Sequence, residues 1–290
     1  MPDRLEAEIQ AVVRTFRGVL GVAAIDLSGA APREIAAVNA DLRFPTASTI
    51  KTAVMLEAYH QSAEGRLAFD TPLTLHASDV VAGSGVLRDM HDGLTLTVGD
   101  AVQLMIGLSD NTATNLLIGR LGTARVNARL DTYGLTSTRL FRPTFRDGRP
   151  DVLPDLEREF GLGMTTPRDM ARLMALIATG RAVNADASKA MLATLRRQQD
   201  RAMIPRLLTD DGVEVGNKTG TDEEKQPGPH GVKGQVRADA AVVTGPNGLH
   251  YALAIYARQV EDTRWTIDND ALVTGARVSK LVYDAVRSGR

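Results

Sequence analysis

The chain has 290 residues, 34 basic and 35 acidic side chains, and no cysteine. The lack of cysteine excludes disulfides, thiol catalysis and thiolate metal sites, and the near-neutral charge gives no reason to expect nucleic acid as a partner. No apolar run is long enough to predict a membrane span. Residues 1–6 carry acids and lack the apolar segment of a signal peptide, so we expect a cytoplasmic protein, or a periplasmic or secreted one if a signal was removed.

The first two thirds of the chain are predicted to be mainly helical. Apolar spacing predicts a helix over residues 6–16, and an apolar, β-branched strand follows over 19–27. Residues 34–39 are predicted to be the hairpin partner of that strand. Helices are then predicted over residues 48–64, 101–108, 111–121, 124–133, 167–178 and 188–197. The second has a capped start at Thr97-Val98-Gly99-Asp100, and Pro167 is expected as a first helical residue after Thr166.

The C-terminal part returns to strands and ends in a helix. Strands are predicted over residues 213–218, 237–244 and 249–258, with a turn signal at Pro246-Asn247-Gly248, and a helix over 270–287. This order predicts an α/β (α+β) fold, in which both chain ends build one antiparallel sheet flanked by helices. We expect a sheet domain of residues 1–45 and 200–290, an inserted all-α domain of residues 46–199, and an active site between them.

Two long irregular stretches interrupt this pattern, at residues 141–164 and 221–235. Both are rich in Pro, Gly or polar residues. Loops of this length are either functional or solvated surface segments, and the sequence leaves both interpretations open.

The first candidate motif is Ser48-Thr49-Ile50-Lys51. Residues three apart share one face of a helix, so the amine of Lys51 would lie beside the hydroxyl of Ser48. A serine hydroxyl needs such a base to become a nucleophile, and a lysine serves only if burial or a second cation lowers its pKa. Two surface neighbours would show the same spacing.

The second and third motifs are Ser109-Asp110-Asn111 and Lys218-Thr219-Gly220. The first lies between two predicted helices, where it would direct Ser109 and Asn111 into a cleft; the alternative is an ordinary helix N-cap. The second ends a predicted strand, where Lys218 and Thr219 would bind a carboxylate and Gly220 would let a ligand approach the backbone. A plain strand end with a turn glycine is the alternative.

Taken together and in this order, the three motifs resemble the signature set of the class A β-lactamases and penicillin-binding proteins, the penicillin-recognising serine enzymes. Phe44-Pro45-Thr46-Ala47, Asn115-Leu116-Leu117 and Thr165-Thr166-Pro167 also look like family positions. The resemblance covers nearly the whole chain and implies the β-lactamase/transpeptidase-like fold.

The resemblance implies a role for each motif residue. Ser48 becomes acylated, Lys51 accepts its proton, and Ser109 with Lys218 passes a proton to the departing nitrogen. The backbone N–H groups of Ser48 and Thr221 would hold the oxyanion. The substrate-binding residues would be Asn111 for a side-chain amide and, for a carboxylate, Thr219, Gly220, Thr221 and Arg237, the last of which fits a surface arginine equally well.

The sequence departs from class A β-lactamases at the base for deacylation. The family carries a glutamate in a Glu-x-x-Leu-Asn motif before the Thr-Thr-Pro helix, and that motif is absent here. Counting back from Thr165 selects Asp151, and counting forward from Thr138 selects Thr144. Asp151 and Glu157 are candidate bases, with solvated loop acids as the favoured interpretation. The acyl-enzyme is therefore expected to form and to break down slowly.

The sequence predicts a serine β-lactamase-like hydrolase that needs no cofactor and no metal. The five histidines are scattered, without the spacing of metal ligands. A D-alanyl-D-alanine carboxypeptidase or esterase, and a penicillin-binding protein that stays acylated, are the alternatives. A small-molecule substrate, a β-lactam or an acyl-D-Ala-like peptide, and a monomer without nucleic-acid or membrane partners complete the expectation.

Overall fold

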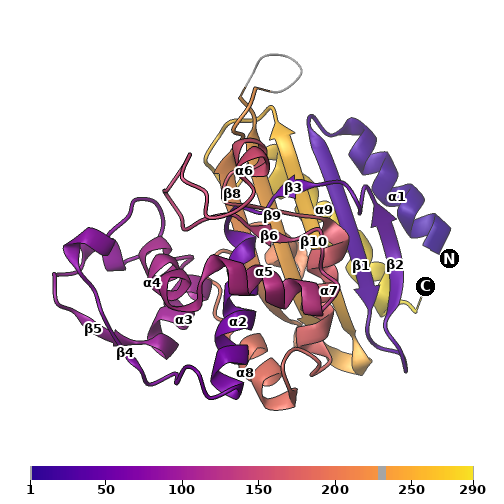
Figure 1. The fold of residues 1–290 in the computed structure, drawn as a ribbon. Coiled ribbons are helices and arrows are strands. Elements are labelled where there is room, and N and C mark those ends of the chain that lie inside the picture. Colours follow the sequence, from indigo (N-terminus) through magenta and orange to yellow (C-terminus); the bar gives the residue numbers. More distant parts are fainter. Residues whose placement is uncertain (1, 228–232, 290) are drawn as a thin grey trace.

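The computed structural model describes residues 2–227 and 233–289, and its centre is an antiparallel sheet (Figure 1). Within the described residues this sheet has five strands in the order β2-β1-β10-β9-β8. Strands from the two chain ends meet where Val19 lies opposite Arg258. The predicted construction of one antiparallel sheet from both termini is confirmed. The strands are β1 (Val19–Asp26), β2 (Arg33–Val38), β8 (Glu214–Glu223), β9 (Gln235–Thr244) and β10 (His250–Val260).

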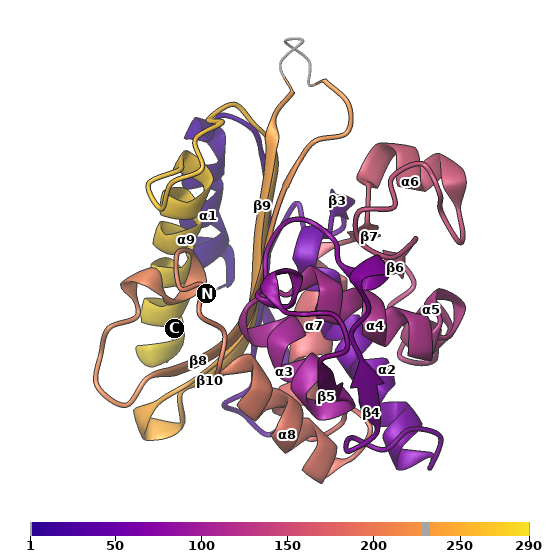
Figure 2. The same cartoon turned by 90° about the vertical axis from the view of Figure 1, so that its left-hand side faces the viewer.

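Helices cover both faces of the sheet, as the edge-on view in Figure 2 shows. The terminal helices α1 (Pro2–Thr15) and α9 (Asp270–Arg287) lie on one face and share a hydrophobic core with it. The other face packs against α7 (Pro167–Ala178) and the helices around it. The sheet and the inserted helices share one continuous core on this side, and the predicted domain boundaries stay a prediction.

The inserted part is mainly helical, and short strands form a three-stranded sheet (β3-β7-β6) and a two-stranded one (β4-β5) within the described residues. Its helices include α2, whose first residue is Lys51, and α4, whose first residue is Asn111. The bounds of the α-helices and strands not yet given are α2 (Lys51–Ala63), α3 (Val98–Gly107), α4 (Asn111–Leu121), α5 (Thr123–Thr132), α6 (Pro154–Phe160), α8 (Ala185–Leu195), β3 (Phe44–Pro45), β4 (Pro72–Thr74), β5 (Thr95–Thr97), β6 (Arg139–Leu140) and β7 (Gly163–Thr165).

Side-chain caps fix the starts of three helices close to the site. Thr97 accepts a hydrogen bond from the backbone N–H of Asp100, whose carboxylate accepts one from Thr97, a capping box that starts α3. Asp110 caps α4, and Thr166 caps α7 with Pro167 in its first turn. The predicted starts at Thr97 and Thr166 are confirmed.

Three predicted boundaries were wrong. Strand β8 continues to Glu223, so Lys218, Thr219 and Gly220 lie inside the strand and not at its end. Ser48 belongs to a 3₁₀ turn (Ala47–Ile50) that precedes α2. The stretch 141–164 was predicted to be irregular, yet it contains the short helix α6 and enters β7.

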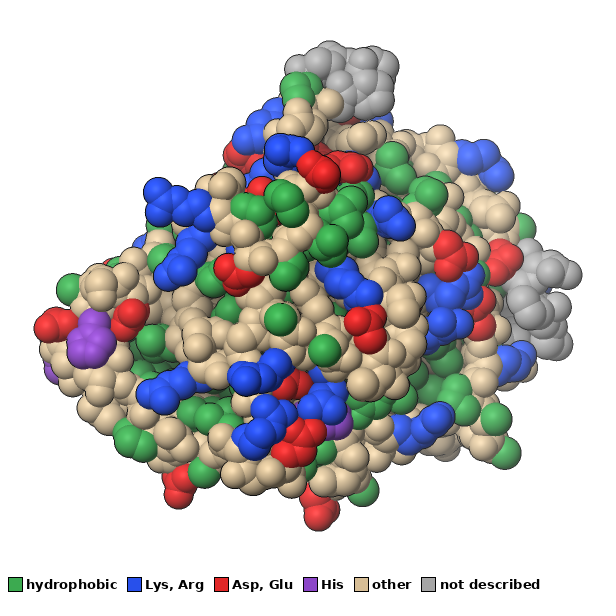
Figure 3. All heavy atoms as spheres, in the orientation of Figure 1, with side chains coloured by type: hydrophobic (Ala, Val, Ile, Leu, Met, Phe, Trp, Pro, Cys, Tyr) green, Lys and Arg blue, Asp and Glu red, His purple; other side chains and the backbone are tan. Residues whose placement is uncertain are grey.

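The surface in Figure 3 mixes basic and acidic side chains over the described part of that face. This pattern fits the nearly balanced formal charge of −1. None of the helices within the described ranges has the length and apolar character needed to cross a bilayer.

Candidate active site

The 3₁₀ turn that carries Ser48 is held in place by the sheet. The hydroxyl of Tyr256, on β10, donates to Oγ1 of Thr49 over 2.7 Å, and Thr49 donates to the carbonyl of Thr46 over 2.7 Å. Ala47 has a φ of +43°, a left-handed conformation that a non-glycine residue adopts only where its surroundings impose it. This arrangement leaves Ser48 partly exposed at the start of α2.

Gly220 allows β8 to approach this turn closely. A Cβ atom at position 220 would lie 2.8 Å from the carbonyl oxygen of Thr46 and 3.2 Å from the Cβ of Ala47. Any side chain there would separate the strand from the turn. The sequence predicted that Gly220 makes room for a ligand, but in the structure the group that approaches it closely is the backbone before Ser48.

Two buried lysines converge on the hydroxyl of Ser109. The amine of Lys51 lies 3.1 Å from Oγ of Ser109, and the amine of Lys218 lies 3.0 Å from the same atom. Lys51 also donates to the carbonyl of Ser109 and to Oδ1 of Asn111, both over 2.7 Å. Three motifs that are far apart in sequence therefore meet in one hydrogen-bonded group, and the predicted helix-surface alternative for Lys51 does not apply.

Burial shifts the pKa values of both amines downward. Burial, followed by the positive charge of Lys218, lowers the pKa of Lys51 well below its usual value, although Asp110 opposes this shift. Burial lowers the pKa of Lys218 to about 8, against the opposing charges of Asp200 and Asp239. A lysine with a lowered pKa loses its proton more readily, so Lys51 has the property that a base for Ser48 requires.

The turn at residues 109–111 both caps a helix and holds two side chains that contact Lys51. Oδ1 of Asp110 accepts from the backbone N–H of Ala113, and Oδ2 accepts from those of Val86 and Leu87 over 2.7 and 2.9 Å. Ser109 has a φ of +56°, which requires such support. The two interpretations of this motif therefore both hold, because Asp110 caps α4 while its neighbours contact Lys51.

Ser48 lies where two cavities meet. A cleft of about 400 Å³ is lined by Ser48, Asn111, Thr144 and Thr221. A smaller cavity of about 270 Å³, which Ser48 also lines, is bordered by Ser109, Thr219, Thr221 and Asp200. Gly83 and Ser84 also line the larger cleft. The proposed substrate-binding residues Asn111, Thr219 and Thr221 thus line the cavities that Ser48 also lines.

The loop between β6 and α6 places neither predicted base in the cleft. The carboxylate of Asp151 accepts a hydrogen bond from the hydroxyl of Thr123, and neither cavity that Ser48 lines includes this residue. Glu157 is buried in an ion pair with Arg142, whose Nε lies 2.7 Å from Oε1 of Glu157. The expectation of a solvated acid agrees with exposed Asp151 but was wrong for Glu157.

Thr144, the position obtained by counting forward, does line the cleft. Its backbone N–H donates to Oδ1 of Asn115 over 2.8 Å, and its own hydroxyl donates to the same oxygen over 3.0 Å. The hydroxyl also lies 3.4 Å from the carbonyl of Asn111. A threonine has no carboxylate with which to activate water, so this position cannot supply the missing base.

Part of the wall of the larger cleft is formed by ion pairs that the sequence did not predict. Lys225 lies 3.4 Å from Asp147 and 3.9 Å from Asp222, and so connects the loop after β6 with the end of β8. Glu223 pairs with Lys233 over 3.0 Å. The one signal for these contacts was the length of the polar stretch 221–235, because their partners come from distant segments.

Arg237 lies opposite Thr221 in the sheet but does not reach the cleft surface. Its side chain is 2% exposed, and its guanidinium lies 4.8 Å from the ring centroid of Trp265. The alternative of a surface arginine was therefore wrong.

The described residues also contain no cluster of three or more side chains suited to hold a metal ion.

Comparison with known proteins defines the class and the family. The fold is that of a serine β-lactamase-like hydrolase. The model of the β-lactamase enzyme family matches residues 4–286, and the chain belongs to this family. A β-lactamase from Sphaerobacter thermophilus is 30% identical, with a TM-score of 0.80, over 98% of this chain and 97% of that one.

Two further relatives represent different members of the group. The structure of PBP-A is 28% identical, with a TM-score of 0.78, over 98% of this chain and 96% of its own. The β-lactamase CARB-3 of Pseudomonas aeruginosa is 23% identical over 99% of this chain and 91% of the relative.

Proposed function

We propose that the protein reacts with β-lactams, forms an acyl-enzyme on Ser48 and releases the acyl group slowly. The observation that carries the acylation step is the group formed by Lys51, Ser109 and Lys218, in which both amines contact one hydroxyl at 3.1 and 3.0 Å. A mutant of PBP-A, 28% identical to this chain, has been captured as an acyl-enzyme complex with penicillin G. That relative supports the same first step here.

In the acylation step, neutral Lys51 accepts the proton of the Ser48 hydroxyl while the serine oxygen bonds to the lactam carbonyl carbon. The carbonyl π electrons move to oxygen, which the backbone N–H groups of Ser48 and Thr221 would stabilise. When the intermediate collapses, the carbon–nitrogen bond breaks and the nitrogen takes a proton from Ser109. Ser109, which lies beside Lys218, regains a proton from the protonated amine of Lys51. Lys51 is then neutral again, so the protons balance over the step.

The substrate contacts follow from the lining of the two cavities. Asn111 would hold the acyl side-chain amide in the larger cleft. Thr219 and Thr221 would bind the substrate carboxylate, with the charge of Lys218 behind them and Arg237 as a second cation. Lys218 attracts a carboxylate only while it is protonated, which links binding of anionic substrates to its pKa.

Slow deacylation is supported by the ion pairs that engage the carboxylates lining the larger cleft. Asp147 and Asp222 both lie within 4 Å of Lys225, and Glu223 lies 3.0 Å from Lys233. Within the described lining, each acid therefore has a cationic partner, and Thr144 carries no carboxylate. Without a positioned base, attack of water on the acyl ester loses a factor of about 10²–10⁴.

A chromogenic cephalosporin tests this proposal directly. We expect a rapid burst of colour of about one equivalent per protein chain, followed by a much slower steady rate. The S48A variant should give neither phase. A fast, linear rate without a burst would contradict slow deacylation, and the absence of any colour change with intact folding would contradict acylation.

The same scaffold supports a second candidate, a D-alanyl-D-alanine carboxypeptidase or esterase. The structural similarity to PBP-A favours this alternative. Release of D-alanine from an acyl-D-Ala-D-Ala peptide, measured by an enzyme-coupled assay and absent in S48A, would support it. No D-alanine release together with a stable penicillin adduct would reject it.

A further inference from the structure

Arg237 is a buried cation that has only neutral partners among the described residues. Its guanidinium donates to the carbonyl of Val236 over 2.9 Å, to the carbonyl of Arg264 over 3.2 Å and to the side-chain oxygen of Gln235. The nearby carboxylate of Asp262 is occupied by the guanidinium of Arg264, at 2.7 and 2.9 Å. Buried charges usually have a counter-charge, because removing an ion from water is costly. An unpaired guanidinium beside the cleft is therefore suited to an incoming anion.

Trp265 covers this cation. Its ring lies over the Arg237 guanidinium, yet the tryptophan itself is 64% exposed while the arginine is 2% exposed. Trp265 also lines the larger cleft together with Ser48 and Thr221. The indole thus has the buried guanidinium close to it and contributes to the wall of the substrate cleft.

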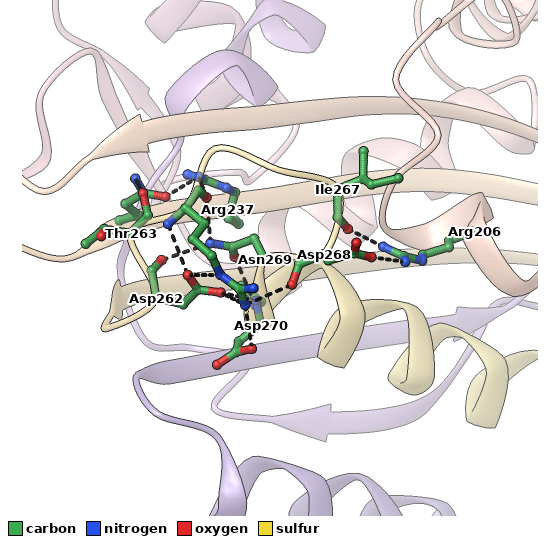
Figure 4. Close-up of polar contacts among 11 residues, drawn as sticks. Arg206, Arg237, Asp262, Thr263, Ile267, Asp268, Asn269 and Asp270 are labelled. Carbon is green, nitrogen blue, oxygen red and sulfur yellow. Dashed lines mark hydrogen bonds and ion pairs between the residues drawn. The ribbon is translucent and has the colours of Figure 1, made fainter.

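The loop that carries Trp265 is held through its backbone and through neighbouring side chains, and Asn269 donates to the carbonyl of Arg264 over 3.0 Å, directly before the tryptophan. Figure 4 shows the contacts at its two ends, where the carboxylate of Asp262 accepts from the backbone N–H of Asp270 over 2.8 Å, and Asn269 donates to the carbonyl of Asp262 over 2.8 Å. On the other side of the tip, Arg206 pairs with Asp268 over 2.8 Å. None of these contacts uses the indole of Trp265, so the side chain can turn while the backbone of the loop stays in place.

The register of the sheet places Arg237, and with it the covering Trp265, next to the proposed carboxylate site. Arg237 is directly opposite Thr221 on β8, and residues opposite each other in an antiparallel pair lie about 5 Å apart. A carboxylate bound to the hydroxyl of Thr221 would therefore lie close to Arg237 and to the indole that covers it.

We propose that Trp265 is a specificity-determining residue, which covers Arg237 in the free protein and yields to substrates whose carboxylate is carried on an apolar ring. The substrate carboxylate then forms an ion pair with the guanidinium of Arg237, and the indole provides an aromatic surface against which the apolar ring of the substrate packs. The inference rests on the proposed function, and it assigns a new role to this chain's own aromatic side chain.

Trp265 is the sole tryptophan of the chain, so intrinsic fluorescence reports its surroundings directly. The S48A variant, which cannot be acylated, is titrated with benzylpenicillin and with the methyl ester of benzylpenicillin. We expect the free acid to shift the emission to shorter wavelength, because the exposed indole becomes covered. The ester, which lacks the anion, should leave the emission nearly unchanged.

The second test compares acylation efficiency for the free acid and for its methyl ester. W265A uncovers Arg237, so the preference for the acid should rise about five- to tenfold, the range that a cation–aromatic contact can contribute. In an R237Q background, the same tryptophan substitution should leave the preference unchanged. Ile267 is the matched control, since it lies on the same loop and is 67% exposed, and I267A should have no effect.

Three results would overturn the inference. They are an acid preference that W265A does not change, an equal effect of that substitution with and without Arg237, and identical fluorescence with acid and ester. If the unchanged protein forms no adduct with benzylpenicillin at all, the proposed function fails and takes the inference with it. An adduct together with an unmoved preference rejects the role of Trp265 alone.

Discussion

Replacing Thr144 by glutamate should create the base that the cleft lacks among its described residues. Thr144 is 5% exposed, lines the cleft with Asn111 and is positioned through the amide of Asn115. The backbone N–H of residue 144 donates to Asn115, and this bond does not depend on the side chain. A longer side chain would therefore start from a fixed backbone and extend toward Asn111, whose Oδ1 accepts from Lys51.

The expected gain in the deacylation rate is about 10²-fold, the lower end of what a general base contributes. The lower end applies because the carboxylate enters a site built for a hydroxyl and loses part of its hydration there. The nearby amine of Lys51 partly compensates, since a cation favours the ionised carboxyl group. Acylation should change little, because the group of Lys51, Ser109 and Lys218 is untouched.

The assay is the decay of the benzylpenicillin adduct, followed by intact-protein mass after free drug is removed. T144Q is the matched control, because it has the size of the glutamate without its basicity. Thermal unfolding of both variants checks that the loop between β6 and α6 is retained. Equal decay rates for T144E and T144Q, with both proteins folded, would refute the assignment of this position.

Four other predictions concern the remaining parts of the site and the loop before α6. S109A should lower the acylation rate about 10²-fold in stopped-flow measurements, because the hydroxyl between Lys51 and Lys218 is lost; an unchanged rate would argue against proton transfer through Ser109. The pKa of Lys218 falls to about 8 in the folded protein, so reaction with anionic substrates should decline above pH 8, and K218R should move this decline to higher pH. Because unfolding returns the pKa of Lys218 toward its usual value, this residue should make stability rise with pH between about 8 and 10.5, which urea unfolding at several pH values can detect. R142M should destabilise the protein by about 3 kcal/mol by leaving Glu157 buried without its cation, and adding E157L should restore most of the loss in urea unfolding.

The sheet and its helices could be predicted because their residues follow regular patterns. The apolar run over 19–27 and the turn at Pro246-Asn247-Gly248 are local signals, and both appear in the structure as expected. Strand β8 was predicted to end at Lys218 because Thr219 and Gly220 break the apolar pattern, yet these three residues are all buried inside the strand. Their burial depends on Ser109 and on the 3₁₀ turn at Ser48, which no local pattern contains.

The chemistry of the site was predictable for the motif residues and not for their surroundings. Glu157 seemed to be a loop acid because its partner, Arg142, precedes it by 15 residues across a stretch without periodicity. Arg237 seemed equally suited to the surface, since the tryptophan that covers it comes from a loop beyond β10. In both cases the deciding contact is formed only when separate segments pack together.

The central claim is that Ser48 is the nucleophile served by two buried amines through one shared hydroxyl. Peptide mapping by mass spectrometry after brief exposure to benzylpenicillin tests it most directly. We predict one penicilloyl group per chain, attached to the peptide that contains Ser48 and strongly reduced when Lys51 is replaced by methionine. A modification elsewhere in the chain, or full labelling of K51M at the same rate, would contradict the account.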